Sequence, residues 1–263
     1  MIRKIFGGAI VTLLAITACG GTGDGAVARS DSNQGDRATT SVASLDDATT
    51  STLATLEVTS TTLTPPLPSD LEGFRSQSVA CGGELPLPPQ QLQFQAPNQL
   101  GIPPEAKPVA TISTSCGDIV VELDPSIAPE TVNSFIFLAE NAYFDGTASH
   151  RILPGFVIQA GDPTATGLGQ PGYVVPDEFP AEPFVYERGL IAMANAGPGT
   201  TGSQFFLMLD DTGLPPQFSV FGRVVEGLDV MDAIAAVPLG VSSRGEQSVP
   251  LESVFINSIT VDR

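Results

Sequence analysis

The sequence predicts a mainly β domain: a closed antiparallel barrel with helical plugs. Short apolar runs of strand length recur from residue 109 onward, separated by loops rich in Gly and Pro. The 27 Gly and 23 Pro residues imply many turns and make a helical bundle a poor match. Apolar residues at helical spacing occur in two segments of this region. Many short strands with two helices are typical of a barrel, and residues 107–263 have the length of one ordinary domain.

The chain begins with a segment typical of export. Arg3 and Lys4 precede an uncharged apolar run that ends at Ala18, and this run is shorter than the roughly 20 residues that span a bilayer. We therefore expect a signal peptide over residues 1–18. The sequence Ile16-Thr17-Ala18-Cys19 resembles the lipobox of bacterial lipoproteins, in which the Cys thiol receives a diacylglycerol group. Cys19 is then the expected lipid attachment, although an ordinary secretory peptide with an incidental Cys is the alternative.

Two segments of unusual composition follow the leader. Residues 19–68 are rich in Ser and Thr and lack apolar periodicity, so we expect a disordered tether. Residues 69–106 are rich in Pro and are expected to be extended and semi-rigid. A Cys outside the cytoplasm needs a partner, and for Cys81 only Cys116 remains once Cys19 carries lipid. We therefore expect a Cys81–Cys116 disulfide, and an anchored protein on the extracytoplasmic side of the cell membrane.

Regular patterning begins with a hairpin and a helix. Residues 109–114 and 118–123 alternate as two strands around a turn at 115–117. Pro129 suits the first position of a helix, and Glu130 is favourable in the first turn. The inward face of this helix is expected from the apolar residues at helical spacing, Val132, Phe135, Ile136 and Ala139.

Further strands and a second helix are expected in the rest of the domain. A second short helix is expected at Leu228–Ala235, with Val230, Met231 and Ile234 inward. The expected strands are Phe156–Gln159, Gly189–Ala194, Phe205–Leu209, Val220–Val225 and Val254–Val261.

Composition and motif context exclude several functions. A formal net charge of −18 argues against nucleic-acid binding, which needs clustered Lys and Arg. One His and three Cys cannot form a Cys₄ or His₃ zinc site, and we expect no metal and no cofactor. A hydrolase triad could use only His150, which has no evident nucleophile as a partner. The G-x-G-x-x-G matches at 167–172 and 197–202 do not open helices, so nucleotide binding is not expected.

Three longer segments carry a specific resemblance. They are residues 149–163, residues 189–206 apart from the loop at 198–201, and residues 218–224. In order and spacing they resemble the signature segments of cyclophilins, the cyclosporin-class peptidyl-prolyl cis-trans isomerases, and the resemblance covers Val109 to Val261. It implies a closed eight-stranded antiparallel barrel capped by two α-helices, with a substrate groove on the outer face. We also expect a monomer that acts on proline-containing segments of exported or cell-surface proteins and assists the folding of exported proteins.

The reaction requires little from the side chains. Rotation about a peptide bond crosses a barrier of about 18–20 kcal/mol, and a catalyst must stabilise the twisted amide more than either planar form. Arg151 matches the catalytic arginine of the family, and its guanidinium N–H can meet the lone pair that the prolyl nitrogen regains. The resemblance implies a catalytic set of Arg151, Phe156, Gln159 and Asn195. It implies substrate-binding positions at Val157, Ala194, Gln204, Phe206, Leu214 and Phe218.

Departures from the family pattern set further expectations. The best-known members carry Met at Val157, Trp near Gly213 and His at Phe218, so we expect weak binding of cyclosporin with an apolar pocket retained. Because rotation transfers no proton, His150 is expected to be a structural, hydrogen-bonded imidazole. The competing interpretation is a chaperone module that binds proline-containing segments without significant turnover. Arg151 distinguishes the two, since a pure binder has no need of it.

Overall fold

The computed structural model describes residues 66–263. The expected signal peptide (1–18), the expected lipid attachment at Cys19 and the tether as far as residue 65 lie outside the described residues. Within residues 66–263, no helix is long and apolar enough to cross a membrane.

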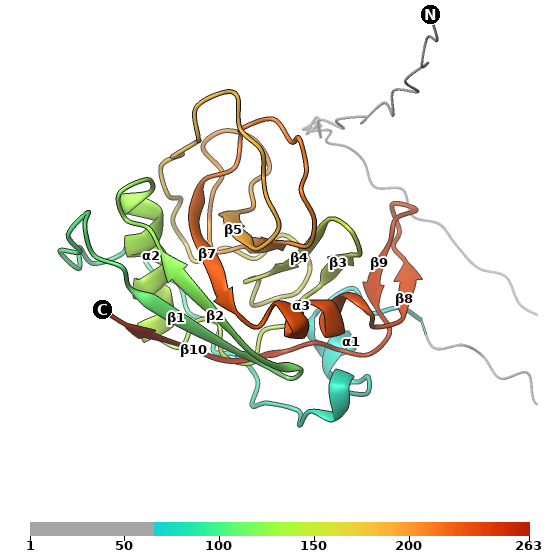
Figure 1. Ribbon diagram of the computed structural model, residues 1–263. Helices are drawn as coiled ribbons and strands as arrows, with labels where there is room; N and C mark the ends of the chain where they lie inside the picture. Colours follow the sequence, from blue (N-terminus) through green and yellow to red (C-terminus); the bar gives the residue numbers. More distant parts are fainter. Residues whose placement is uncertain (1–65) are drawn as a thin grey trace, which may run out of the picture. The chain divides into compact units, whose positions relative to one another are not determined.

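The described chain contains the following helices and strands (Figure 1). The α-helices are α1 (Leu71–Arg75), α2 (Pro129–Glu140) and α3 (Leu228–Ala235), and a 3-10 turn covers Ala80–Gly82. The strands are β1 (Val109–Thr114), β2 (Gly117–Leu123), β3 (Arg151–Leu153), β4 (Val157–Ala160), β5 (Leu190–Met193), β6 (Phe205–Met208), β7 (Val220–Glu226), β8 (Leu239–Val241), β9 (Gln247–Pro250) and β10 (Ile256–Asp262).

Eight of these strands form one curled antiparallel sheet, which confirms the mainly β class and the strand number. The strand order is β10-β1-β2-β7-β5-β6-β4-β3, while β8 and β9 form a separate two-stranded hairpin. Closure of the barrel is not confirmed, because no ladder joins β10 to β3 among the described strands. The two ends of the sheet approach each other where residues 146–149, before β3, meet residues 254–256: the isolated bridge between Ala148 and Phe255 lies there, and Ile256, the first residue of β10, exchanges backbone hydrogen bonds with Gly146 and Thr147. Since β3 begins three residues after Ala148 and is short, the pairing stops there and the sheet is a half-barrel.

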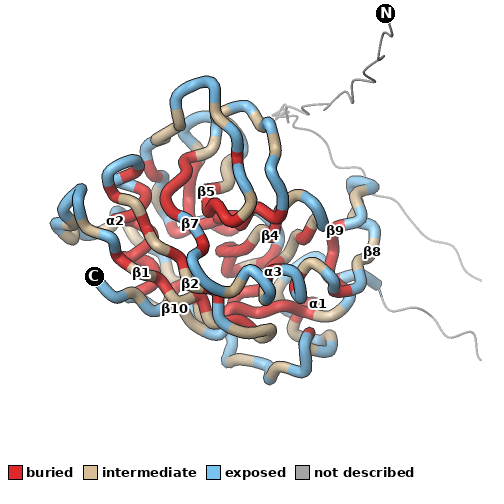
Figure 2. The backbone as a smooth tube through the Cα atoms, viewed as in Figure 1, coloured by how far each residue is buried: buried red, intermediate tan, exposed pale blue. Residues whose placement is uncertain are grey.

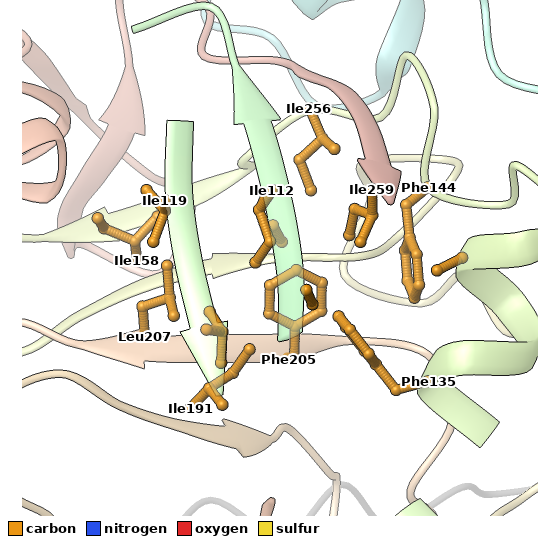
Figure 3. Packing of buried hydrophobic residues seen from close by; sticks show 14 of the residues in the cluster. Ile112, Ile119, Phe135, Phe144, Ile158, Ile191, Phe205, Leu207, Ile256 and Ile259 are labelled. Atoms are coloured by element: carbon orange, nitrogen blue, oxygen red, sulfur yellow. The ribbon is translucent and has the colours of Figure 1, made fainter. Parts of the chain in front are cut away.

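The concave face of the sheet holds the main hydrophobic core (Figure 3). Successive residues of a strand point to opposite faces, so every second residue of β4 and β6 faces this core. Ile158, Phe205 and Leu207 are each at most 3% exposed. Figure 2 shows the same pattern along the chain, with buried residues following the sheet strands and exposed residues following the loops.

The two predicted helices close the core from different ends. In α2 the predicted inward residues are all buried, and Phe135 lies edge-to-face with Phe205 at 5.6 Å between ring centroids. Pro129 stands in the first turn of α2, as predicted. In α3 Met231 and Ile234 are at most 1% exposed and pack against the same core. Val230, also predicted inward, is only partly buried against this core. The inward residues of α2 are confirmed, but burial extends over all of Thr131–Ala139 and is not limited to the predicted face.

Residues 66–108, named here the N-terminal strap, lie against the domain. Phe74 of α1 is 2% exposed and belongs to a small apolar cluster with Phe255. The backbone N–H of Ala80 donates to Ser253 O at 2.9 Å, and further along the strap Phe94 lies edge-to-face with Phe137 of α2 at 4.9 Å. The strap is thus fixed to the sheet and to α2 at separate points.

A disulfide joins the strap to the first hairpin. Cys81 and Cys116 are bonded, with their Cα atoms 5.0 Å apart, as the sequence predicted. Cys116 lies in the two-residue turn between β1 and β2, where Thr114 pairs with Gly117. Neither cysteine belongs to a strand, so the bond links the strap to the turn outside the strand pairs of the sheet.

Candidate active site

The candidate active site begins on the convex face of the β3–β4 hairpin. Arg151 of β3 stands directly opposite Gln159 of β4, and Gln159 is in turn opposite Phe206 of β6. Because cross-strand partners share a face, these three side chains lie side by side on the outer surface. Their neighbours Ile152 and Ile158 point into the core. The alternation of apolar and functional residues in β3 and β4 thus places a charged group on the outside of a well-packed sheet.

A line of hydrogen bonds connects the polar side chains of this face. Arg151 Nη1 donates to Gln159 Oε1 at 3.2 Å, and Gln159 Nε2 donates to Gln204 Oε1 at 3.0 Å. Gln204 Nε2 donates to the carbonyl of Gly169 at 3.3 Å, which ties the line to the loop after β4. Bonded in this way, the guanidinium and both amides have defined orientations, as groups that read a peptide backbone require.

An apolar cluster adjoins this polar line. It has its own core, separate from the concave core, in which Val157 and Phe206 are at most 5% exposed. The partly buried side chains of Phe156, Leu214 and Phe218 pack against it. Phe206 and Phe218 lie edge-to-face at 5.5 Å. These five apolar residues, all of them site positions that the resemblance implied, are therefore brought together outside the concave core, on the face that carries Arg151.

Asn195 and Ala194 lie on the segment after β5, next to Gln204. The backbone N–H of Ala194 donates to Gln204 O at 2.8 Å. The side chain of Asn195 bridges two loops: its Nδ2 donates to Gln217 O at 2.8 Å, and its Oδ1 accepts from Gly197 N at 3.1 Å. Bonded in this way, the Asn195 side chain holds the loop that carries Phe218.

Two residues that the sequence analysis missed support the site. Tyr186 is fully buried, and its hydroxyl donates to Phe218 O at 3.0 Å and accepts from Phe218 N at 3.1 Å. Burial raises the pKa of Tyr186 above its ordinary value, so the hydroxyl stays protonated. Glu246, in the β8–β9 hairpin, accepts two hydrogen bonds from Arg151. No local pattern could reveal either residue, because they lie 32 and 95 positions from their partners.

His150 precedes Arg151 but takes no part in the polar line. Burial lowers the pKa of its imidazole, an effect that the Arg151 charge reinforces and Asp162 opposes, so the ring is neutral at pH 7. The expected hydrogen bond is absent at one nitrogen: Nδ1 is buried with no partner among residues 66–263. The ring lies toward the loop after β4, where Nε2 approaches the position that a Cβ on Gly167 would occupy.

Comparison with known proteins places these features in a family. Residues 109–261 match the family described as Cyclophilin type peptidyl-prolyl cis-trans isomerase/CLD. The "Probable peptidyl-prolyl cis-trans isomerase B" of Mycobacterium tuberculosis is 37% identical over 218 residues, which are 75% of this chain and 68% of that protein. The "Peptidyl-prolyl cis-trans isomerase B" of Streptomyces anulatus is 43% identical over 171 residues, 58% of this chain and 95% of that protein.

Solved structures agree. A crystal structure of a cyclophilin type peptidyl-prolyl cis-trans isomerase from Cryptosporidium parvum matches with a TM-score of 0.53 and 29% identity, over 60% of this chain and 99% of that one. A second structure of that protein, in the presence of the dipeptide Ala-Pro, matches with a TM-score of 0.51 and 28% identity, over 59% of this chain and 99% of that one. The family match spans more than half of the sequence. The fold and the arrangement of the outer face agree with it. The chain belongs to the cyclophilin-type peptidyl-prolyl cis-trans isomerases.

Proposed function

We propose that the outer face of β3, β4 and β6 catalyses rotation of X-Pro peptide bonds, with Arg151 as the catalytic residue. The observation that carries this proposal is the juxtaposition of a guanidinium with an apolar cluster on one face of the sheet. Arg151 and Gln159 face the same side as Phe206, and Phe206 packs against Phe218. A proline ring held by the cluster would have its nitrogen within reach of a planar fork of donors.

The proposed chemistry follows from the electronic change that accompanies rotation of the X-Pro peptide bond. Resonance delocalises the prolyl nitrogen lone pair into the carbonyl, and twisting the bond returns that lone pair to the nitrogen. A donor from Arg151 stabilises the twisted form and has no such acceptor in either planar form, which is the condition for lowering the barrier. Gln159 and Gln204, with Ala194 and Asn195 beside them, are the proposed contacts to the flanking peptide backbone. Rotation requires no proton transfer, which agrees with the finding that His150 takes no part in the line of hydrogen bonds at Arg151.

The experiment that tests this function is exchange NMR on an X-Pro peptide with the full mature chain. Wild-type protein should catalyse exchange, and Arg151→Ala should lower turnover by about one to three orders of magnitude, which is about 1.4–4 kcal/mol. Arg223→Ala removes an arginine of β7 that is paired with Glu187 at 2.7 Å, and serves as the matched control with unchanged turnover. Peptide binding by the wild type without any exchange would instead establish the chaperone module.

We further propose that the enzyme works outside the cytoplasm, anchored by lipid at Cys19 as a monomer, on exported proteins. The lipobox-like sequence at residues 16–19 supports the anchor. The Cys81–Cys116 disulfide supports an oxidising compartment. Two acyl chains suffice for stable anchoring where a single chain does not. Mass spectrometry of the mature protein tests this: a diacylated N-terminal Cys19 is expected, and an unmodified Cys19 would contradict the anchor.

A further inference from the structure

The β8–β9 hairpin lies outside the eight-stranded sheet and packs against β3 (Figure 1). Hydrogen bonds close its turn: Ser242 N donates to Glu246 O at 2.7 Å, and Gly245 N donates to Ser242 O at 2.9 Å. Glu246 N also donates to Ser242 Oγ at 3.3 Å. The backbone of Glu246 is therefore fixed where β9 begins, beside the strand that carries Arg151.

The carboxylate of Glu246 takes one whole edge of the Arg151 guanidinium. Arg151 Nε donates to Glu246 Oε2 at 2.7 Å, and Arg151 Nη2 donates to Glu246 Oε1 at 2.8 Å. The remaining terminal nitrogen, Nη1, donates to Gln159 Oε1 at 3.2 Å, on the side of the neighbouring strands β4 and β6. The guanidinium is thus held on two sides: the carboxylate of Glu246 binds Nε and Nη2, and the side-chain amide of Gln159 binds Nη1.

We propose that Glu246 is a positioning residue for catalysis: it holds the guanidinium of Arg151 so that Nη1 faces the proline-binding cluster. The inference rests on the proposed function, because it concerns how the catalytic side chain is oriented. A free arginine side chain has several rotatable bonds and many rotamers, and a two-point contact with a carboxylate removes much of that freedom. Donors oriented before the reaction need no reorganisation in the twisted state.

The contact between Arg151 and Glu246 is expected to contribute more to turnover than to the stability of the fold. The side chains of Arg151 and Glu246 are 32% and 37% exposed, and pairs so close to solvent contribute little to folding. The Arg151 hydrogen bond lowers the pKa of Glu246, assisted by the Arg244 charge and opposed by partial burial, so the carboxylate is charged at neutral pH. Loss of the pair should therefore change the rate more than the free energy of unfolding.

The test measures kcat and KM separately by exchange NMR for a graded set of variants. Glu246→Gln keeps the size of the side chain but removes its charge, and should lower kcat about three- to tenfold with KM within about twofold of the wild type. Glu246→Asp keeps both carboxylate oxygens and should recover part of the loss. Glu187→Gln removes the acceptor of the Arg223 pair, which is 2.7 Å long and also partly exposed, and should leave kcat unchanged.

Two further measurements separate positioning from a general structural effect. In an Arg151→Ala background, Glu246→Gln should have no additional effect, because the group that Glu246 orients is missing. In ¹⁵N spectra, the Arg151 Nε–H resonance should shift in Glu246→Gln and stay in place in Glu187→Gln. Both variants should unfold at the denaturant concentration of the wild type.

The outcomes distinguish this inference from the function on which it rests. An active wild type whose Glu246→Gln variant turns over at the same rate, or faster, would overturn the positioning role and leave the isomerase function standing. A wild type without exchange activity would overturn the function and the positioning role together. An equal loss in the Arg151→Ala background would also overturn the positioning role, since Glu246 would then act through another group.

Discussion

The two faces of β4 and β6 differ in what covers them. On the concave face, Ile158 and Phe205 are enclosed by both plugging helices and the opposite strands. On the convex face, Gln159 and Phe206 stand among loop residues and polar side chains that remain partly open to solvent. Neighbouring positions of one strand therefore serve different purposes: the inner residues supply apolar burial, and the outer ones supply a shaped surface beside Arg151. Substitutions on the two faces should separate stability from turnover.

The largest effect should come from the concave face. Phe205→Ala removes a ring that lies 5.6 Å from Phe135 and 5.7 Å from Phe144, and should lower the free energy of unfolding by about 3–5 kcal/mol. Urea denaturation measures this, and turnover per folded molecule should be retained. Phe206→Ala is the matched variant on the other face, and should raise KM for the peptide with a smaller loss of stability. A larger loss of stability in Phe206→Ala, or a larger loss of turnover in Phe205→Ala, would show that stability and turnover do not depend on different faces of the sheet.

The disulfide should rank next, with an effect confined to stability. Cys81 and Cys116 are 35 positions apart, and in the chain-entropy model a closed loop of this length contributes about 3–4 kcal/mol. The double variant Cys81→Ser/Cys116→Ser should lose about this amount in chemical denaturation, with kcat unchanged because the bond lies away from the convex face. Wild-type stability in the double variant would show that the strap is held by its packing alone.

A smaller change is expected at Gly213, where the best-known relatives carry a Trp near this position. Gly213 is exposed, and an added Cβ would meet no atom within 4 Å, so a larger side chain fits. Gly213→Trp should tighten cyclosporin binding about tenfold through one new hydrogen bond, with peptide turnover nearly unchanged. Titration of the drug into the exchange assay measures this. Low-nanomolar inhibition of the wild type would show that other groove residues already replace the Trp.

The smallest effect should be a pH dependence of stability that turnover does not share. Burial lowers the pKa of His150 in the folded protein, whereas the unfolded chain takes up the proton near pH 6.5. The unfolded state thus binds more protons just below pH 6.5, and stability should fall as the pH drops from 7.5 to 5.5. His150→Asn should flatten this slope in denaturation curves. A turnover profile that follows the same slope would assign His150 a part in the reaction.

The sequence predicted the elements that local spacing defines. The first hairpin and α3 were expected almost to the residue, and the start of α2 was expected at Pro129, because the hairpin alternates around a turn and both helices have apolar residues at helical spacing. β3, β8, β9 and α1 were missed, because each has only three to five residues and none lies in a run of three or more apolar residues, such as the runs that marked the equally short β4, β5 and β6. Closure of the sheet was expected and is absent, because it depends on the distant edges of β3 and β10 rather than on any segment alone.

The site residues also fall into two groups: those that the sequence predicted and those that only the fold reveals. Arg151, Gln159 and the pocket residues lie in segments long enough to carry the family resemblance, and the structure brings them together. Tyr186 and Glu246 have ordinary sequence surroundings and become visible only through contacts made across the fold. Residues proposed to contact the substrate were therefore accessible from the sequence, whereas residues that bond to those groups from distant segments were not.

The most direct test of the division between the faces uses two neighbours on β3. Arg151 faces outward, and Ile152 is fully buried in the concave core. Unfolding free energy and exchange turnover should be measured on the same samples of Arg151→Ala and Ile152→Ala. We expect Arg151→Ala to lose at least tenfold in turnover with less than about 1 kcal/mol of stability, and Ile152→Ala to lose about 2–5 kcal/mol of stability while its folded molecules keep their turnover. Normal turnover in a folded Arg151→Ala protein would contradict the account.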